Sequence, residues 1–470
     1  MIEMIKEKKS VGIIGAGLAG LSAGALLSKK GFKVTIFEKE EFIGGRALSF
    51  IGKNLTLKNY KKILSNFYMN IAFSEPVIGK IFDKKLLDGY TLDLGFHAIG
   101  NGNANSIQEL LSEFNEQVDT LDTNTGLIKE NGYKFPFISA SDKLRMLPLI
   151  LRLFIISDSN MKKFDSVPMA ETIERYGKGR TKIALEVFSR SITTVNNLNY
   201  ISTGEMLRVE KRLAKSSKPV GYPKYGFHSY SNALINIIKR NRGKIYLNKP
   251  VSKIIINKNK ALGVVVENKK YHFNYIISNI LVQNLFNIAS EKQFPKEYVK
   301  KLKSLEGTGS LCAYYSLNKV NPELVGKSFQ FIERNIGVDG NDAVGIIDFM
   351  TSVPEANLSP PGKYLVQSYI ICTPKEAQDI KILKKLKTLL DKNLQLLIPN
   401  YKSNLNWAIY PAIWHLDGVA KTIYNDKPKI KTPIENLYLI GDCVKAPGIG
   451  MNCAVNSAYI LTNLLNNSTN

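Results

Sequence analysis

The sequence predicts an α/β protein in which a parallel sheet with flanking helices is interleaved with a second, α+β part. Three observations carry this prediction. Residues 10–50 read as a strand, a glycine-rich turn, a helix and a second strand. Residues 243–277 form a run of short strands, and residues 437–451 read as a strand and a glycine-rich loop that lead into a final helix. Strands that alternate with helices are typical of a parallel sheet.

The first strand and the turn after it are the strongest local signal. Residues 11–14 are a short apolar run that ends at a glycine, which favours a buried parallel strand over a helix. Gly15, Gly17 and Gly20 follow in the spacing G-x-G-x-x-G. Residues 18–30 then predict a helix, because they are apolar and alanine-rich and are followed by a further glycine.

A second strand, residues 33–37, leads to Glu38, which lies about 20 residues beyond the glycines. A carboxylate at this place accepts hydrogen bonds from a ribose 2′-OH and repels the 2′-phosphate of NADP. Because Gly17 lacks a Cβ, a diphosphate can approach the backbone, and the N-terminus of the following helix offers free N–H groups. Strand, turn, helix, strand and acid are in register, so the segment predicts a dinucleotide site rather than a chance glycine-rich turn.

Gly44, Gly45 and Arg46 favour FAD over NAD as the bound dinucleotide. Two glycines let the backbone lie against a ligand, and an arginine can fork onto diphosphate oxygens. Alone, the three residues would be interpreted as an ordinary loop with a solvated arginine.

Together, the motifs GAGLAG, EKE and GGR resemble the FAD-binding signature of the flavin amine oxidase and phytoene desaturase superfamily. Residues 437–451, LYLIGDCVKAPGIGM, resemble the closing motif of that superfamily, in which a strand delivers Gly-Asp to the cofactor and a helix begins at the flavin ring. The resemblance implies a Rossmann-like FAD-binding domain that is interleaved with an α+β substrate domain.

The same resemblance implies where the cofactor lies. Asp442 is expected near the ribityl chain and diphosphate, Val251 beside the adenine, and residues 450–452 near the isoalloxazine ring. The helix that begins near Met451 would stabilise negative charge on the reduced flavin. The predicted cofactor-binding residues are Gly15, Ala16, Gly17, Leu18, Ala19, Gly20, Glu38, Lys39, Gly45, Arg46, Val251, Gly441, Asp442, Gly450, Met451 and Asn452.

The domains are expected to be discontinuous. The predicted FAD-binding domain comprises residues 1–100, 222–285 and 400–470, and the predicted substrate-binding domain comprises residues 101–221 and 286–399. No internal repeat or low-complexity linker separates them. Each excursion is therefore expected to leave the cofactor fold and rejoin it.

Composition restricts the class of protein. The chain has 470 residues and 44% hydrophobic residues, which suits one large or two smaller globular domains. No apolar run is long enough to span a bilayer and the N-terminus lacks the apolar core of a secretory signal, so we expect a cytoplasmic protein, with peripheral membrane contact as an alternative. Four cysteines without C-x-x-C or zinc spacing indicate unpaired thiols and no metal site. The net charge of +24 comes mostly from dispersed lysines, which favours compositional bias over nucleic-acid binding, with anionic lipid as a second interpretation.

Three further segments are candidates for the substrate side. Residues 144–156, LRMLPLILRLFII, predict either a buried helix kinked at its proline or an amphipathic segment on a membrane. His97 lies in YTLDLGFHAIG, which resembles the D-x-G-x-H segment of the superfamily, and it either contacts flavin or substrate or packs elsewhere. Trp407, Tyr410 and Trp414 precede the closing motif, and they either line the pocket above the flavin or pack in the core.

The predicted chemistry is the loss of two electrons from a substrate C–H bond, with hydride transfer to FAD. Only one dinucleotide fingerprint is present, so a second site for NAD(P)H is not expected. The resemblance leaves an isoprenoid such as phytoene or another carotenoid, an amine and a porphyrinogen open as substrates. The apolar segment 144–156, the D-x-G-x-H segment and the Gly-Asp closing motif favour a lipophilic substrate and a desaturase-like dehydrogenase. A structural flavoprotein and an NAD-dependent dehydrogenase are the alternatives from other classes. The sequence identifies no catalytic base.

Overall fold

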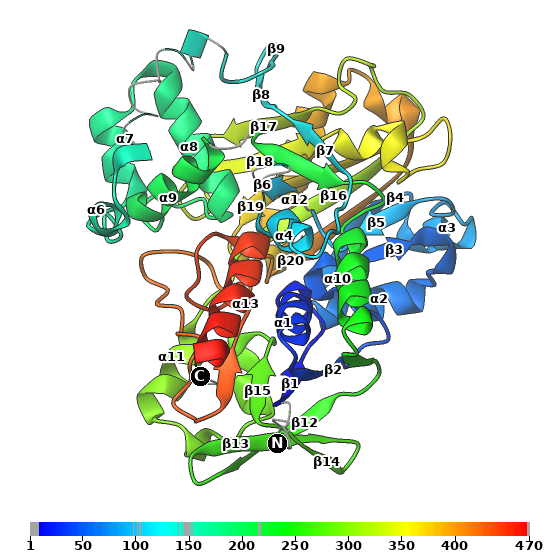
Figure 1. The fold of residues 1–470 in the computed structure, drawn as a ribbon. Coiled ribbons are helices and arrows are strands. Elements are labelled where there is room, and N and C mark those ends of the chain that lie inside the picture. The colour runs from blue at the N-terminus through cyan, green and yellow to red at the C-terminus, as the bar shows by residue number, and fades with distance from the viewer. Residues whose placement is uncertain are drawn as a thin grey trace.

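The computed structural model describes residues 9–96, 98–100, 102, 105–139, 141–142, 144, 151, 154–214 and 218–467. These residues form two parts, which lie one above the other in Figure 1. The lower part is built on a five-stranded sheet and the upper part on an eight-stranded sheet. The chain crosses between the two parts several times, as the order of the strands in both sheets shows.

The five-stranded sheet has the order β11-β2-β1-β15-β21, and all of its neighbouring pairs are parallel. Its central strand is fully buried at Val11 and Ile13, as expected for a strand that is covered on both faces. This sheet confirms the predicted α/β class. The strands are β1 (Ser10–Ile14), β2 (Lys33–Phe37), β11 (Lys244–Tyr246), β15 (Tyr275–Ser278) and β21 (Leu437–Leu439).

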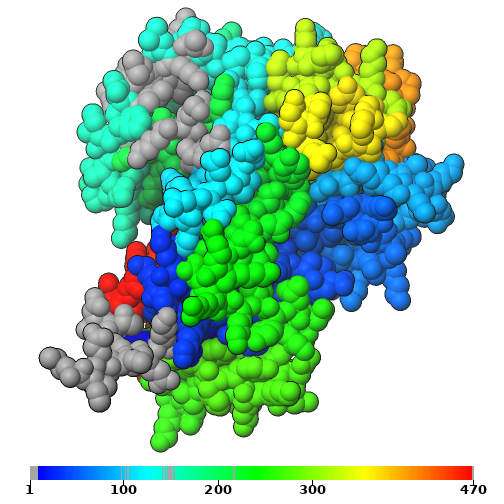
Figure 2. Space-filling view, turned by 45° about the vertical axis from the view of Figure 1, so that its right-hand side comes forward, coloured from blue at the N-terminus to red at the C-terminus, as the bar shows by residue number. Residues whose placement is uncertain are grey.

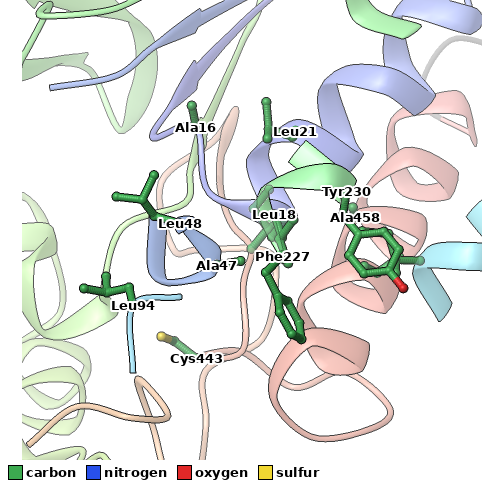
Figure 3. Packing of buried hydrophobic residues seen from close by; sticks show 14 of the residues in the cluster. Ala16, Leu18, Leu21, Ala47, Leu48, Leu94, Phe227, Tyr230, Cys443 and Ala458 are labelled. Carbon is green, nitrogen blue, oxygen red and sulfur yellow. The ribbon is translucent and has the colours of Figure 1, made fainter. Parts of the chain in front are cut away.

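Helices from distant parts of the chain cover this sheet. α1 (Leu18–Lys29) packs against both α10 (His228–Arg240) and α13 (Gly450–Asn467), and Figure 1 shows the first and last of these helices side by side. A Cβ on Gly24 of α1 would lie 2.9 Å from Ile36 Cδ1, so the helix approaches the sheet closely. Figure 3 shows the resulting core, in which Leu18 and Ala47 lie near Phe227 of the segment before α10. The first and last motifs of the sequence therefore belong to one core.

The eight-stranded sheet has the order β4-β20-β16-β19-β18-β17-β8-β9 and is antiparallel except between β17 and β8. α12 (Ile380–Leu397) packs on it through Leu383, Leu386 and Leu390, which are buried. The strands are β4 (Met69–Glu75), β8 (Thr125–Lys129), β9 (Gly132–Lys134), β16 (Gly309–Leu317), β17 (Ser328–Glu333), β18 (Ala343–Asp348), β19 (Tyr364–Cys372) and β20 (Leu405–Ile413).

Two strands of this sheet differ from the predicted division of the chain. β4 and β20 lie within residues 1–100 and 400–470, which the sequence assigned to the FAD-binding domain, yet both belong to the eight-stranded sheet. The two strands pair with each other across more than 300 residues of sequence. The other domain boundaries stay predictions.

The helices of residues 169–213 lie beside the eight-stranded sheet in Figure 1. In Figure 2, the segments around residues 160–200 and 330–400 lie above the blue and green segments. Residues 168–195 form two helices, α7 (Met169–Tyr176) and α8 (Gly179–Thr193). The break lies at Gly177, where a Cβ would be 2.5 Å from the Ile173 carbonyl oxygen. α9 (Thr203–Leu213) follows and is capped by the Ser202 hydroxyl.

Smaller sheets and helices complete the described fold, with sheets of the order β6-β10-β7, β12-β13-β14 and β3-β5. No helix within the described residues is long and apolar enough to cross a membrane. His97 lies outside the described residues, as does most of 144–156. The remaining elements are β3 (Ser49–Ile51), α2 (Leu57–Asn66), α3 (Ile78–Asp83), β5 (Thr91–Asp93), β6 (Ile99–Gly100), α4 (Ser106–Ser112), β7 (Thr120–Thr123), α6 (Asp158–Lys162), β10 (Val220–Pro223), β12 (Val251–Asn257), β13 (Lys260–Val266), β14 (Lys269–His272) and α11 (Lys296–Ser304).

Candidate functional site

A cavity of about 620 Å³ extends from the carboxyl ends of β1 and β2 past the start of α13 and into the upper part of the molecule. Its volume lies within the range of about 300–1,000 Å³ that is typical of small-molecule and cofactor sites. Every predicted cofactor-binding residue lines the cavity except Ala16 and Gly20. The wall includes Gly15, Gly17, Leu18, Ala19, Glu38, Lys39, Gly45, Arg46, Val251, Gly441, Asp442, Gly450, Met451 and Asn452.

The glycine turn between β1 and α1 has a physical reason at each of its three positions. Gly15 has a φ of +97°, and a Cβ on Gly20 would lie 2.2 Å from the Gly15 carbonyl oxygen. Gly17 is the N-cap of α1, and neither a capping side chain nor an acidic residue in the first turn satisfies the helix N-terminus. Leu18 and Ala19 of this first turn line the cavity. The turn therefore presents unpaired N–H groups and partial positive charge to it.

Glu38 is held in place by the backbone around it. Its Oε2 accepts a hydrogen bond from the Ala16 N–H at 2.7 Å, and its Oε1 accepts one from the Glu40 N–H at 3.0 Å. Burial raises the pKa of this carboxyl, and the two backbone donors act in the opposite direction. Ala16 therefore has a structural task, orienting Glu38, while the Glu38 side chain itself lies on the cavity wall.

The two glycines before Arg46 pack directly against the glycine turn. The Gly44 N–H donates to the Ala16 carbonyl oxygen at 3.0 Å. Gly44 and Gly45 have φ values of +118° and +58°, and a Cβ on Gly45 would lie 3.2 Å from the Gly17 Cα. A side chain at Gly45 would therefore push this loop away from the glycine turn, and one at Gly44 would meet Ser231 Oγ at 3.1 Å.

Arg46 joins the two ends of the chain. Its Nη2 donates to Asp442 Oδ1 at 2.6 Å, and its Nη1 donates to the Leu416 carbonyl oxygen at 2.9 Å. Asp442 Oδ2 accepts a further hydrogen bond from the Gly418 N–H at 2.8 Å. Burial alone would raise the pKa of Asp442, but Arg46 outweighs it and holds the pKa below its ordinary value. The sequence predicts that Arg46 forks onto diphosphate oxygens, whereas the structure places two of its nitrogens on protein acceptors.

The closing motif, residues 437–451, lines the cavity at the start of α13. Gly441 and Gly448 have φ values of +122° and +88°, and α13 begins at Gly450. Lys421 Nζ donates to the Gly448 carbonyl oxygen at 3.0 Å and forms an ion pair of 2.7 Å with Glu205 of α9. The loop before α13 is thus tied to a helix of the upper part.

These features fit a bound FAD. A bare helix N-terminus with a Cβ-free turn suits a diphosphate, and an oriented carboxylate suits a ribose. The loop that leads into α13 offers glycine backbone for close approach, and the N-terminus of that helix favours negative charge beside it.

The structure adds wall residues that sequence analysis missed. Asn279 follows β15, its Nδ2 donates to the Gly15 carbonyl oxygen at 3.3 Å, and a Cβ on Gly441 would lie 3.4 Å from its Oδ1. Its position at the carboxyl end of a parallel strand was the signal that could have identified it. Asp417 and Thr194 also line the cavity, and they come from a loop and a helix end without any recognisable motif.

The aromatic residues before the closing motif pack in the core. Trp407, Tyr410 and Trp414 are not among the residues that line the cavity, and Trp407 packs edge-on against Tyr90 with ring centroids 5.0 Å apart. Of the two interpretations that the sequence left open, the structure therefore supports core packing.

Comparison with known proteins gives distant relatives. The chain is 28% identical over 298 residues to an uncharacterized protein of Methanocaldococcus jannaschii. This match covers 61% of this chain and 63% of the relative. It is 26% identical over 332 residues to a phytoene desaturase of Fusarium fujikuroi, which covers 67% of this chain and 56% of the relative. In both cases the match spans less than two thirds of the relative's length.

Solved structures share the fold over almost the whole chain. An oxidoreductase from Methanosarcina mazei matches with a TM-score of 0.69 at 21% identity, covering 97% of this chain and 100% of that one. A putrescine oxidase matches with a TM-score of 0.64 at 12% identity, covering 98% of this chain and 99% of the other.

Two family models match the chain itself. The model of an NAD(P)-binding Rossmann-like domain matches residues 13–62, and the model of flavin containing amine oxidoreductases matches residues 79–461. These matches confirm FAD as the predicted cofactor and, at the level of the family, an FAD-dependent oxidoreductase as the predicted class. With more than half of its residues under the second model, this chain belongs to the flavin containing amine oxidoreductase family.

Proposed function

We propose that this protein oxidises a lipophilic, isoprenoid-like substrate by a two-electron, desaturase-like reaction. The observation that carries the proposal is the part of the cavity beyond the start of α13, between α8, α9 and the eight-stranded sheet. Its wall is mainly apolar and suits a substrate that lacks charged groups. The apolar residues of this part are Phe96, Ile99, Phe188, Ile192, Val209, Leu213, Val220 and Ile346.

We also propose how the chain holds its cofactor. Val251 would lie at the adenine, Glu38 at the ribose, the turn at Gly17 at the diphosphate, and residues 450–452 at the isoalloxazine ring. Bound FAD supplies an acceptor for the hydride of a substrate C–H bond. The chain's own contribution is to hold the substrate carbon beside the start of α13 and to exclude water through the apolar wall.

Two alternative substrates fit the wall less well. A site for an amine between two aromatic rings needs a gap between the rings, but Phe96 and Tyr369 stack on each other with centroids 4.5 Å apart. A porphyrinogen needs several cations for its propionates. Among the described residues that line the upper part of the cavity, Arg212 is the one lysine or arginine.

Anaerobic bleaching of the bound flavin distinguishes these substrates. We expect a polyene such as phytoene to reduce the flavin, whereas a polyamine and a porphyrinogen leave it oxidised. Ile192→Asp should retain FAD and lose reduction by the polyene at least about 100-fold, because a carboxylate on an apolar wall must be desolvated against the substrate. Lys182→Asp, on the exposed side of the same helix, is the matched control. Reduction by an amine as fast as by the polyene, or an Ile192→Asp protein with wild-type rates, would contradict the proposal.

We further propose that the exposed apolar residues Leu144, Leu151 and Ile155 contact a membrane surface, from which a lipophilic substrate enters. Described side chains there are strongly exposed, with 70% for Leu144, 53% for Leu151 and 83% for Ile155. Lys211 Nζ donates to the Ile156 carbonyl oxygen at 2.8 Å, and exposed apolar groups near such a cation favour an anionic interface. We expect the protein to float with phosphatidylglycerol vesicles at low salt and Ile155→Glu to reduce this binding. Ile380→Glu, at an exposed position of α12, should bind like the wild type. Equal flotation of all three proteins would refute the contact.

A further inference from the structure

Asp417 is a carboxylate on the wall of the cavity next to the first residue of α13. A Cβ placed on Gly450 would lie 3.5 Å from Asp417 Oδ1. The other oxygen, Oδ2, accepts a hydrogen bond from the Thr194 hydroxyl at 3.2 Å. The backbone is fixed as well, because the Asp417 N–H donates to Thr308 Oγ1 at 3.0 Å and the Thr308 N–H donates to the Asp417 carbonyl oxygen at 3.2 Å. The Oδ2 atom is therefore held by a hydrogen bond, whereas the Oδ1 atom lies toward the start of α13.

Thr194 adopts a backbone conformation that is unusual for its type. It is the C-cap of α8, with φ +53° and ψ +34°, and a β-branched residue is strained in this left-handed region. This conformation places its hydroxyl 3.2 Å from Asp417 Oδ2, 2.9 Å from Thr308 Oγ1 and 2.7 Å from the Thr193 carbonyl oxygen. Thr194 and Asp417 both line the cavity. A strained residue that contacts an acid on a cavity wall indicates a functional constraint.

Charged groups from several elements act on Asp417. The pKa of Asp417 is raised to about 6, with burial as the largest cause and Asp442 of the closing motif acting in the same direction. Lys427 and Arg46 lower it, as does the hydrogen bond from Thr194. A carboxyl group that exchanges its proton close to neutral pH is suited to general acid–base chemistry.

We propose that Asp417 is a catalytic residue that accepts the proton a substrate loses during oxidation, with Thr194 as the positioning residue that orients it. In the oxidation of a CH–CH unit, one carbon loses a hydride, for which bound FAD would be the two-electron acceptor. The proton of the neighbouring carbon passes to the Asp417 carboxylate, and the electron pair of that second C–H bond forms the C=C bond. The carboxylate becomes a neutral acid, and the two electrons leave the substrate with the hydride. The inference rests on the proposed oxidation but not on the identity of the substrate.

The first arm of the test observes the carboxyl group without any substrate. Infrared spectra of the FAD-loaded protein between about pH 4 and 8 should show a carboxylic-acid band that titrates near pH 6 and is missing in Asp417→Asn. Thr194→Val should move this titration to higher pH, because the hydroxyl donor stabilises the carboxylate, and Thr194→Ser should restore it. A purely structural threonine would not shift the titration.

The second arm follows anaerobic flavin bleaching with any substrate that reduces the wild type. The rate should rise with pH through the titration of Asp417 and then level off, because the carboxylate is the active form. Asp417→Asn should be slower by at least about 100-fold, with a flat pH profile. A wild-type pH profile in Asp417→Asn, or no titrating band that depends on Asp417, overturns the inference. If no lipophilic substrate reduces the wild type while the band titrates as expected, the proposed function fails and the assignment of Asp417 stands.

Discussion

Gly17→Val is expected to give a folded protein that no longer retains FAD. The backbone at Gly17, with φ −74° and ψ 172°, is extended and tolerates valine. A Cβ there would meet Asn279 Nδ2 at 3.1 Å and, among the described residues, no other atom within 4 Å. The valine methyl groups therefore enter the space beside the N-terminus of α1, where we place the diphosphate. We expect the affinity for FAD to fall by more than about 100-fold, which corresponds to about 2.7 kcal/mol, measured by flavin fluorescence after dialysis.

Two further valine substitutions separate loss of the cofactor from loss of the fold. A Cβ on Gly20 would lie 2.2 Å from a backbone oxygen, so Gly20→Val should lower the melting temperature as well as the flavin content. Gly79→Val, where a Cβ meets nothing within 4 Å, should keep a full complement of FAD. A yellow, fully loaded Gly17→Val protein would refute the proposed position of the diphosphate.

Arg46→Ala is expected to destabilise the protein by about 3 kcal/mol and to weaken FAD retention. Removing one partner of a buried ion pair leaves the other charge uncompensated, at a typical cost of about 3–5 kcal/mol. The side chain of Asp442 is only 6% exposed and would lose its 2.6 Å partner, although the Gly418 N–H still donates to it. We therefore expect the lower end of this range, measured as the free energy of unfolding in urea.

The pH dependence tests the same ion pair. In the wild type the pKa of Asp442 is lowered, so its contribution to stability is present above the unfolded pKa and is lost as the pH falls through the folded value. Without Arg46, burial raises the pKa, and the carboxyl group then destabilises the fold as the pH rises. The difference in the free energy of unfolding between wild type and Arg46→Ala should therefore shrink toward acidic pH. Asp442→Asn should lower the free energy of unfolding by less than Arg46→Ala does, because the Arg46 side chain is 28% exposed and can be hydrated. A difference that is independent of pH would contradict this account.

The lower part, which contains the glycine turn, could be predicted closely because the sequence signals for its strands and helices are local. A four-residue apolar run, a glycine triplet and an acid at a fixed distance follow from the geometry of one βαβ unit. β1, α1 and β2 accordingly begin and end within a residue or two of the predicted positions. The closing motif likewise gave the start of α13 to within one residue.

The upper part, which contains the eight-stranded sheet, was harder to predict because the order of its strands depends on pairing between distant segments. β4 and β20 pair in a sheet that combines segments from many parts of the chain. No local sequence pattern indicates that these two strands are neighbours. Trp407 packs in the core because it belongs to β20. Asp417 escaped notice because a single acid in a loop carries no spacing, and only the folded chain brings Thr194 to it.

The two ends of the chain are expected to enclose one FAD. The measurement that tests it most directly is the visible spectrum of the purified protein, followed by identification of the nucleotide released on denaturation. We predict a yellow protein that releases about one FAD per chain, because the sequence has one dinucleotide turn and this turn lines the cavity. A colourless protein that binds NAD, or one that cannot be loaded with FAD, would contradict the account.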